Sequence, residues 1–346
     1  MDETTKFYYD SFADVINEKY PQGYQVALIK SEEYGFLGLR EQNYQYLAKL
    51  GELNNDSFIA DIGCGNGQFH KFLKSHPDYK NCQYVGVDCC SRQIDNAIKS
   101  AESYSSSFFC IDMNEFFSRE PYFDAVYFIE SIGYTTDLET LIKSVSTGLK
   151  IGGKIIIKNP IKVVNDQELD LKYQEEFASI EREYGYSENS LGMLPSKNNI
   201  EEKFVQNGFE VEKIEVPDVD VMSYNEIFCS TDELTTAHPA YIQHISQKVP
   251  QNYGDNQYHE CMVFVFKKVS DIIEDTKQLP FVQQRYDQYT QNEPMDKVIQ
   301  RSIQEKGIDI MDPLTLQMYN SNPDAAAAAI KKNATENPDS FLNTQS

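Results

Sequence analysis

A short apolar run followed by three glycines constrains the fold of this chain more than any other feature. Residues 59–69 read I-A-D-I-G-C-G-N-G-Q-F, in which the glycines are Gly63, Gly65 and Gly67. Glycines lack the Cβ atoms that would keep a ligand away from the backbone. The nicotinamide-binding pattern G-x-G-x-x-G needs its third glycine at position 68, where this chain has Gln68. Asp61 would repel a pyrophosphate, so the turn favours a ligand that carries a cation, such as the amino group of an amino-acid-like cofactor.

A second acidic residue follows the glycines at the distance expected for a nucleoside ligand. Residues 83–88 (Q-Y-V-G-V-D) form a predicted strand that ends at Asp88, about 20 residues beyond the glycine turn. An acid at this offset can accept hydrogen bonds from both ribose hydroxyls of an adenosine. It can also cap a helix that begins near residues 91–94. Both roles for Asp88 remain open at this point.

Three further predicted strands and a helix complete the pattern. Strands at 107–111 and 123–129 each end at an acid, Asp112 and Glu130. An amphipathic helix at 137–149 leads through L-K-I-G-G-K into a buried strand at 155–157. Alternating strands and helices are typical of an α/β fold with a parallel sheet.

This order of motifs resembles class I S-adenosylmethionine-dependent methyltransferases, firmly over about residues 55–160 and loosely over 1–54 and 161–268. The resemblance implies a Rossmann-like, doubly wound seven-stranded sheet with a helical N-terminal cap and inserts. It implies S-adenosylmethionine as cofactor, with Asp112 holding the adenine amino group and the next residue packing on the ring. The expected cofactor-binding residues are Tyr9, Asp61, Gly63, Cys64, Gly65, Gly67, Asp88, Cys89, Asp112, Met113 and Ile129.

The N-terminal segment narrows the resemblance to the group that contains the sterol and geranyl-diphosphate C-methyltransferases and the cyclopropane fatty-acid synthases. The shared features are a Y-Y-D run at 8–10 and a Q-N helix before the glycine turn. By this resemblance Tyr9 and Gln42 contact the methionine end of the cofactor. Tyr9 can instead be an ordinary residue of an amphipathic helix. The chain departs from the group at Tyr34, where a histidine is frequent.

Glu130 is the candidate catalytic residue, because it ends the fourth strand beside the expected methyl position. The resemblance implies that an acid here stabilises a carbocation and takes up a proton. The alternative is that Glu130 caps the next turn or binds a backbone amide. His238 and His259 are alternative bases, although loop histidines are more often polar surface.

Composition limits the partners. The net charge is −23, from 31 Lys and Arg against 54 Asp and Glu, with no basic run. Nucleic-acid binding needs basic residues, so no nucleic-acid partner is expected. The fourth strand also lacks the Asn/Asp-Pro-Pro-aromatic box of amino-directed DNA methyltransferases, since Asn159-Pro160 is predicted to follow the fifth strand. We expect no membrane span, no metal site, and a cytoplasmic protein with reduced cysteines.

Three regions are predicted. Residues 1–50 form a helical cap, 51–270 the methyltransferase domain with inserts at about 161–196 and 217–258, and 271–346 a polar, largely disordered tail. An apolar helical face between residues 169 and 184 fits either a solvated helix on the core or a lid over the acceptor pocket. The tail is either a solubilising segment or a binding site for a protein partner.

The sequence thus predicts a methyltransferase that acts on a small-molecule acceptor, such as a lipid or isoprenoid carbon or an amine. Two alternatives remain: a protein methyltransferase recruited through the acidic tail, and a catalytically silent module that binds S-adenosylmethionine.

Overall fold

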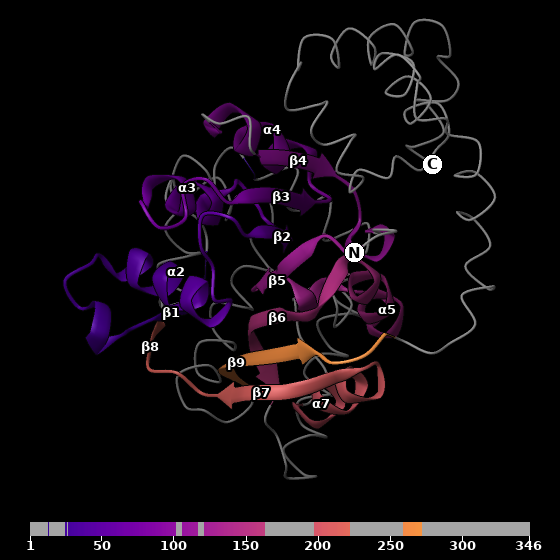
Figure 1. Cartoon of the computed structure of the whole chain (residues 1–346). Coiled ribbons are helices and arrows are strands. Elements are labelled where there is room, and N and C mark those ends of the chain that lie inside the picture. The colour runs from indigo at the N-terminus through magenta and orange to yellow at the C-terminus, as the bar shows by residue number, and fades with distance from the viewer. Residues whose placement is uncertain are drawn as a thin grey trace, which may run out of the picture.

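A seven-stranded sheet forms the centre of the molecule (Figure 1). The computed structural model describes residues 13, 25, 27–101, 106–116, 121–162, 197–221 and 259–271. The strand order is β4-β3-β2-β5-β6-β9-β7. The first five of these strands are parallel, and β9 runs antiparallel to both β6 and β7. The strands are β2 (Phe58–Ile62), β3 (Gln83–Asp88), β4 (Ser106–Cys110), β5 (Phe123–Ile129), β6 (Leu149–Lys162), β7 (Phe209–Glu215) and β9 (His259–Lys268).

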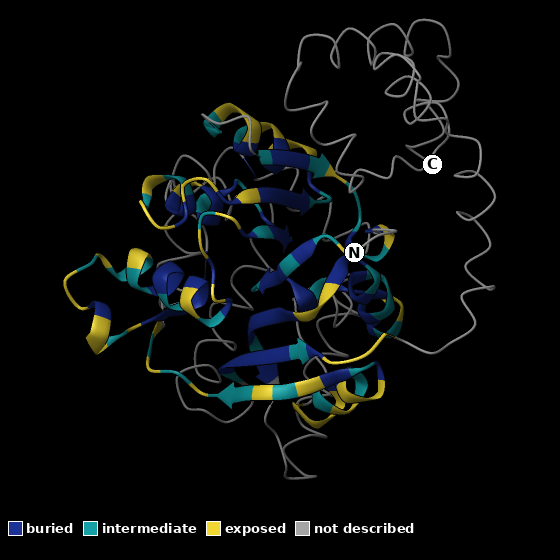
Figure 2. Cartoon of the chain, in the orientation of Figure 1, coloured by how far each residue is buried: buried dark blue, intermediate teal, exposed yellow. Residues whose placement is uncertain are grey.

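Helices cover both faces of this sheet, which confirms the predicted doubly wound α/β fold. The helices α2, α3 and α4 pack on the face that carries Ala125 and Tyr127 of β5, and α5 and α7 pack on the face that carries Val126 and Phe128. This alternation follows from the pleat of a strand whose two faces are both buried. Figure 2 shows the inner strands as largely buried. The helices are α2 (Leu39–Leu50), α3 (Gln68–Ser75), α4 (Ser91–Ser100), α5 (Leu138–Gly148) and α7 (Lys197–Gln206), with 3-10 turns η1 (Glu32–Tyr34), η2 (Met113–Glu115) and η3 (Ile132–Tyr134).

The local sequence explains where α5 begins and where α7 ends. Asp137 precedes α5, and its Oδ1 accepts a hydrogen bond from the backbone N–H of Thr140 at 3.0 Å. The bonds from Thr140 hold the pKa of Asp137 below its usual value. At the other end of the domain, Gly208 follows α7 with a φ of +84°, the left-handed conformation that ends helices. The bounds of α5 confirm the helix predicted at 137–149 to within one residue at each end.

The fifth predicted strand is longer than expected, and one prediction is therefore wrong. Asn159 and Pro160 lie inside β6 rather than after it, with Pro160 opposite Cys261 of β9. The neighbouring strand β5 has its last pairing between Ile129 and Lys158. At Pro160 one side of β6 is therefore no longer paired with β5, and a proline without an N–H is tolerated.

A second, two-stranded sheet was not predicted. The strand β1 (Ala27–Ile29) pairs antiparallel with β8 (Val219–Val221), and the backbone N–H of Lys30 donates to Asp218 O at 2.9 Å. All three residues of β1 are buried. This pairing joins the segment before α2 to the segment after β7.

Several predictions fall outside the described residues: Tyr9, the helical face at 169–184, His238 and the tail from 272 onward. Within the residues that are described, no helix is both long and apolar enough to cross a membrane.

Candidate ligand site at the glycine turn

The glycine turn between β2 and α3 is shaped by contacts that only glycine allows. The backbone N–H groups of Gly63 and Cys64 both donate to Val87 O, at 2.7 and 2.9 Å, which holds the turn against β3. Gly63 has a φ of +79°, and a Cβ there would overlap the side chain of Ser131. Gly65 has a φ of +53°, yet no heavy atom of the described residues lies within 4 Å of where its Cβ would be. The turn is therefore closed at Gly63 and open at Gly65, which leaves room for a ligand against the backbone.

Asp61 places a buried carboxylate just before this turn. Asp61 is 2% exposed, and the hydroxyl of Tyr84 donates to Asp61 Oδ2 at 2.6 Å. Its Oδ1 is buried with no hydrogen-bond partner among the described residues. Burial, together with the charge of Asp88, raises the pKa of Asp61 to about 7, although the hydrogen bond from Tyr84 acts in the opposite direction. An unsatisfied buried carboxylate oxygen is costly unless a donor or cation meets it.

Asp88 ties the glycine turn to the start of the next helix. Its Oδ2 accepts from the backbone N–H of Gly65 at 3.0 Å, and its Oδ1 accepts from that of Cys90 at 2.9 Å. Cys90 is the N-cap residue of α4, so Asp88 holds the backbone just before the helix but is not itself the helix cap. The hydrogen bond from Gly65 to Asp88 also holds the glycine turn in place. Binding of ribose hydroxyls by Asp88 stays a prediction.

The other predicted cofactor-binding residues that the structure describes lie at the same edge of the sheet. Cys64 follows β2, Cys89 follows β3, Asp112 and Met113 follow β4, and Ile129 ends β5. The carboxyl ends of parallel strands meet at one edge, where open α/β sheets bind ligands. Asp112 Oδ1 accepts from the backbone N–H and the side chain of Asn114, at 2.8 and 2.9 Å. Met113 is buried in the core, and burial raises the pKa of both cysteines.

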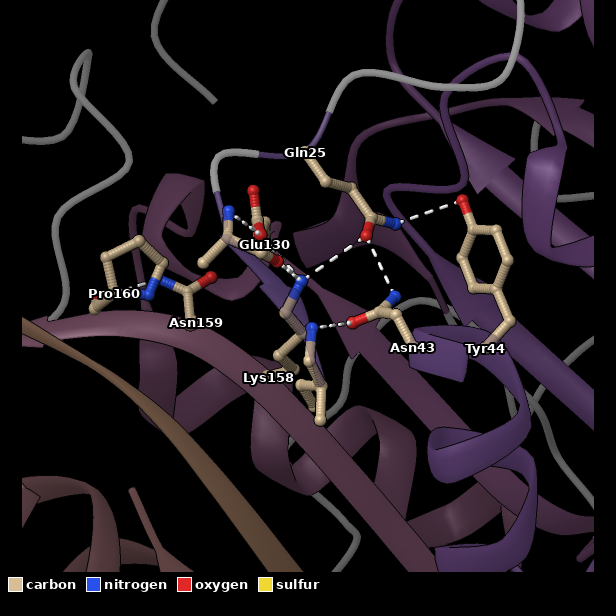
Figure 3. A network of polar contacts seen from close by, with 9 residues as sticks. Gln25, Asn43, Tyr44, Glu130, Lys158, Asn159 and Pro160 are labelled. Carbon is tan, nitrogen blue, oxygen red and sulfur yellow. Dashed lines mark hydrogen bonds and ion pairs between the residues drawn. The ribbon is translucent and has the colours of Figure 1, made fainter. Parts of the chain in front are cut away.

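Glu130 lies at this edge in an unusual backbone conformation. Its φ is +57°, which is rare for a residue other than glycine and is often found at functional sites. Its Oε1 accepts from Lys158 Nζ at 2.7 Å and from the backbone N–H of Ala27 at 3.1 Å (Figure 3). The side chain of Lys158 is 0% exposed and that of Glu130 is 10% exposed. Glu130 thus binds a backbone amide, as the alternative interpretation required, and its catalytic role stays a prediction.

Sequence reasoning missed the polar network around this ion pair (Figure 3). Lys158 also donates to the backbone carbonyl of Ala27 and to Gln25 Oε1, the latter at 3.3 Å. Gln25 Oε1 accepts from Asn43 at 3.0 Å, and its amide group donates to the Tyr44 hydroxyl at 3.1 Å. A lysine directly after three isoleucines was the available signal, because a lysine is almost never fully buried unless it is paired.

Gln42, the other residue expected near the methionine end, has both polar atoms bound to nearby backbone. Its Oε1 accepts from the Ser31 N–H at 3.1 Å, and its Nε2 donates to Leu37 O at 2.9 Å. Gln42 therefore shapes the loop before α2. In the described part of the chain, no group of three His, Cys, Asp or Glu residues is placed to hold a metal ion.

Sequence comparisons match part of this chain to known proteins. Residues 60–157 match the family described as "Methyltransferase domain". The chain is 23% identical over 161 residues to carboxy-S-adenosyl-L-methionine synthase of Shewanella sediminis. This alignment covers 44% of this chain and 66% of that protein. It is 25% identical over 174 residues to sterol 4-C-methyltransferase strm-1 of Caenorhabditis elegans, which covers 49% of this chain and 51% of that protein. The chain thus matches only part of the length of each curated relative.

Solved structures share the fold at low sequence identity. The [4+2]-cyclase SpnF is 16% identical, with a TM-score of 0.57 over 75% of this chain and 94% of that chain. Geranyl diphosphate C-methyltransferase from Streptomyces coelicolor A3(2), solved with Mg²⁺, geranyl diphosphate and S-adenosyl-L-homocysteine, is 14% identical, with a TM-score of 0.52 over 76% of this chain and 98% of that chain. These neighbours confirm the Rossmann-like sheet.

Proposed function

Residues 60–157 are a methyltransferase domain of the S-adenosylmethionine-dependent class, and on that premise we propose that the chain transfers a methyl group to a small-molecule acceptor. One observation carries the proposal: the Oδ1 atom of Asp61 is buried, has no partner in the described part of the structure, and precedes the glycine turn. The amino group of S-adenosylmethionine is a cation that suits such an oxygen. The name of one curated relative, carboxy-S-adenosyl-L-methionine synthase, supports the same class of cofactor.

In this proposal, different residues at the sheet edge bind different parts of the cofactor. The glycine turn and Asp61 hold the amino-acid part, and Asp88 accepts from the ribose, oriented by the backbone amides that it already binds. Asp112 and Met113 serve the adenine. Cys64, Cys89, Ile129 and Tyr9 complete the site.

The cofactor supplies an electrophilic methyl group on a sulfonium, and the protein must align the acceptor with it and exclude water. In this proposal Glu130 faces the acceptor as a fixed negative charge, since Lys158 and the Ala27 amide hold its Oε1. A fixed carboxylate stabilises the positive charge that develops when an alkene carbon is methylated. This chemistry favours a lipid or isoprenoid carbon as acceptor. An amine, already nucleophilic when deprotonated, is the second candidate.

The wider organisation remains part of the proposal. Residues 1–50 act as a cap, 51–270 form the catalytic domain, and 271–346 form a polar tail that binds a protein partner. A net charge of −23 supports a protein without nucleic-acid substrates. We place the protein in the cytoplasm.

Titration calorimetry with S-adenosylmethionine and with NAD tests the cofactor assignment, and a metabolite extract supplied with labelled methyl donor tests for the acceptor. We expect binding of S-adenosylmethionine, none of NAD, and transfer of label to a small molecule. Gly65→Val should abolish binding, because its side chain would fill the open face of the turn. Gly152→Val is the matched control, since Gly152 also has a positive φ, of +83°, with open space around it, but lies at the start of β6. Equal binding by the parent and Gly65→Val would exclude the turn as the cofactor site.

A further inference from the structure

We propose that Tyr84 is a positioning residue for the amino group of the cofactor and acts through Asp61. The inference rests on the proposed function, because it concerns how that site recognises a cation. The Tyr84 hydroxyl donates to Asp61 Oδ2 at 2.6 Å, which fixes the rotation of the carboxylate. The other oxygen, Oδ1, has no hydrogen-bond partner among the described residues. One oxygen is thus anchored in the protein, and the other is left for a ligand.

The ring of Tyr84 is held by side chains from two other elements. Tyr84 lies in β3 and is 1% exposed. His70 of α3 packs with its ring centroid 4.9 Å away, and Phe108 of β4 packs at 5.6 Å. A ring that is enclosed in this way cannot turn its hydroxyl elsewhere. The hydrogen bond to Asp61 is therefore a preorganised feature of the fold and does not need to form when a ligand arrives.

The hydroxyl also favours the charge state that a cationic ligand requires. Burial raises the pKa of Asp61, and the hydrogen bond from Tyr84 lowers it. A donor to a carboxylate stabilises its ionised form. Loss of the hydroxyl would therefore leave Asp61 both free to rotate and more readily protonated, and each change weakens the attraction for an ammonium group.

A second buried tyrosine provides a matched control. Tyr127 of β5 lies directly opposite Asp61 in the parallel pairing of β2 with β5. It is 0% exposed and so as buried as Tyr84, but its hydroxyl donates to the backbone carbonyl of Leu47 at 3.4 Å. Tyr127→Phe removes a buried hydroxyl from the neighbouring strand and leaves the bond to Asp61 intact.

The test is titration calorimetry of the full chain with three adenosine ligands. S-adenosylhomocysteine carries the amino and carboxylate groups, 5′-deoxy-5′-(3-aminopropylthio)adenosine carries only the amino group, and 5′-methylthioadenosine carries neither. We expect Tyr84→Phe to weaken the two amines about tenfold or more, as for the loss of a hydrogen bond to a charged group. It should change the affinity for 5′-methylthioadenosine by less than about twofold. Tyr127→Phe should leave all three affinities at the parent values.

Two results would overturn the proposal: an equal loss for all three ligands, or no loss for any. A double variant identifies the route, since Asp61→Asn with Tyr84→Phe should bind the amines no more weakly than Asp61→Asn alone, and additive losses would mean that Tyr84 acts elsewhere. If Tyr84→Phe does not fold, Asp61→Asn carries the test and must weaken the amines alone. A parent that binds none of the ligands would instead refute the proposed function, and this inference with it.

Discussion

Asp61→Asn should remove a pH dependence of stability that the parent shows near neutral pH. Burial raises the pKa of Asp61 from 3.8 to about 7 in the folded chain. Between these values the folded protein keeps a proton that the unfolded chain has lost, so the stabilising contribution is present at low pH and is lost as pH rises through 7. The difference of about 3 pKa units corresponds to about 4 kcal/mol once Asp61 is ionised in both states.

The part of this loss of stability that is easiest to test near neutral pH lies between pH 6 and 8. Integrating the linkage relation over this range gives a fall of about 1.4 kcal/mol in the free energy of unfolding of the unliganded parent. Asparagine does not ionise, and its side-chain oxygen can still accept from Tyr84, so Asp61→Asn should lack this fall. At pH 8 the variant should be the more stable protein, by about 1–3 kcal/mol after the cost of burying its amide hydrogens. It should nevertheless bind S-adenosylmethionine more weakly.

Urea unfolding at pH 6, 7 and 8, without ligand, measures these free energies. Asp137→Asn is the control, because the pKa of Asp137 is lowered, and its carboxylate is ionised in both states across this range. It should keep its helix cap, because the asparagine oxygen can still accept from the backbone N–H of Thr140, and it should keep the slope of the parent. The reasoning is refuted if parent and Asp61→Asn decline equally with pH, or if Asp61→Asn destabilises the chain while cofactor affinity is unchanged.

Three further predictions concern stability. Lys158→Met should lower the free energy of unfolding in urea by about 3–5 kcal/mol, because it leaves Glu130 buried without its cation. Lys154→Met, at another position of β6, removes ion pairs to the more exposed Glu52 and Glu212 and should cost less. Gly63→Ala should lower the unfolding free energy by about 1–3 kcal/mol, since its Cβ would overlap Ser131, and a variant with an unchanged melting temperature would contradict the close contact at this turn. Burial lowers the pKa of His70 from 6.5 to about 3, so stability should be full above pH 6.5 and be lost as pH falls toward 3; an acid titration of His70→Gln should lack this component.

The sequence alone predicted the features that depend on short-range pattern. Alternation of apolar runs with amphipathic helices predicted the sheet. Asp61 and Asp88 come at or just before the end of a strand, and Asp112 follows one. Because parallel strands place their carboxyl ends at one edge, residues far apart in the sequence could be assigned to one ligand site from their positions at strand ends. The same reasoning placed Glu130 at this edge, but it did not identify Lys158 as its ion-pair partner.

The tertiary structure alone decided the partners of those residues. A hydrogen bond from Tyr84 to Asp61, an ion pair from Lys158 to Glu130, and the pairing of β1 with β8 join positions that share no local pattern. Periodicity predicts that a position is buried, but the sequence does not say which polar atoms meet across strands once the chain has folded. The cost of burying a charge then selects the pairing, since a lysine or carboxylate inside the fold is stable only where a partner lies within reach.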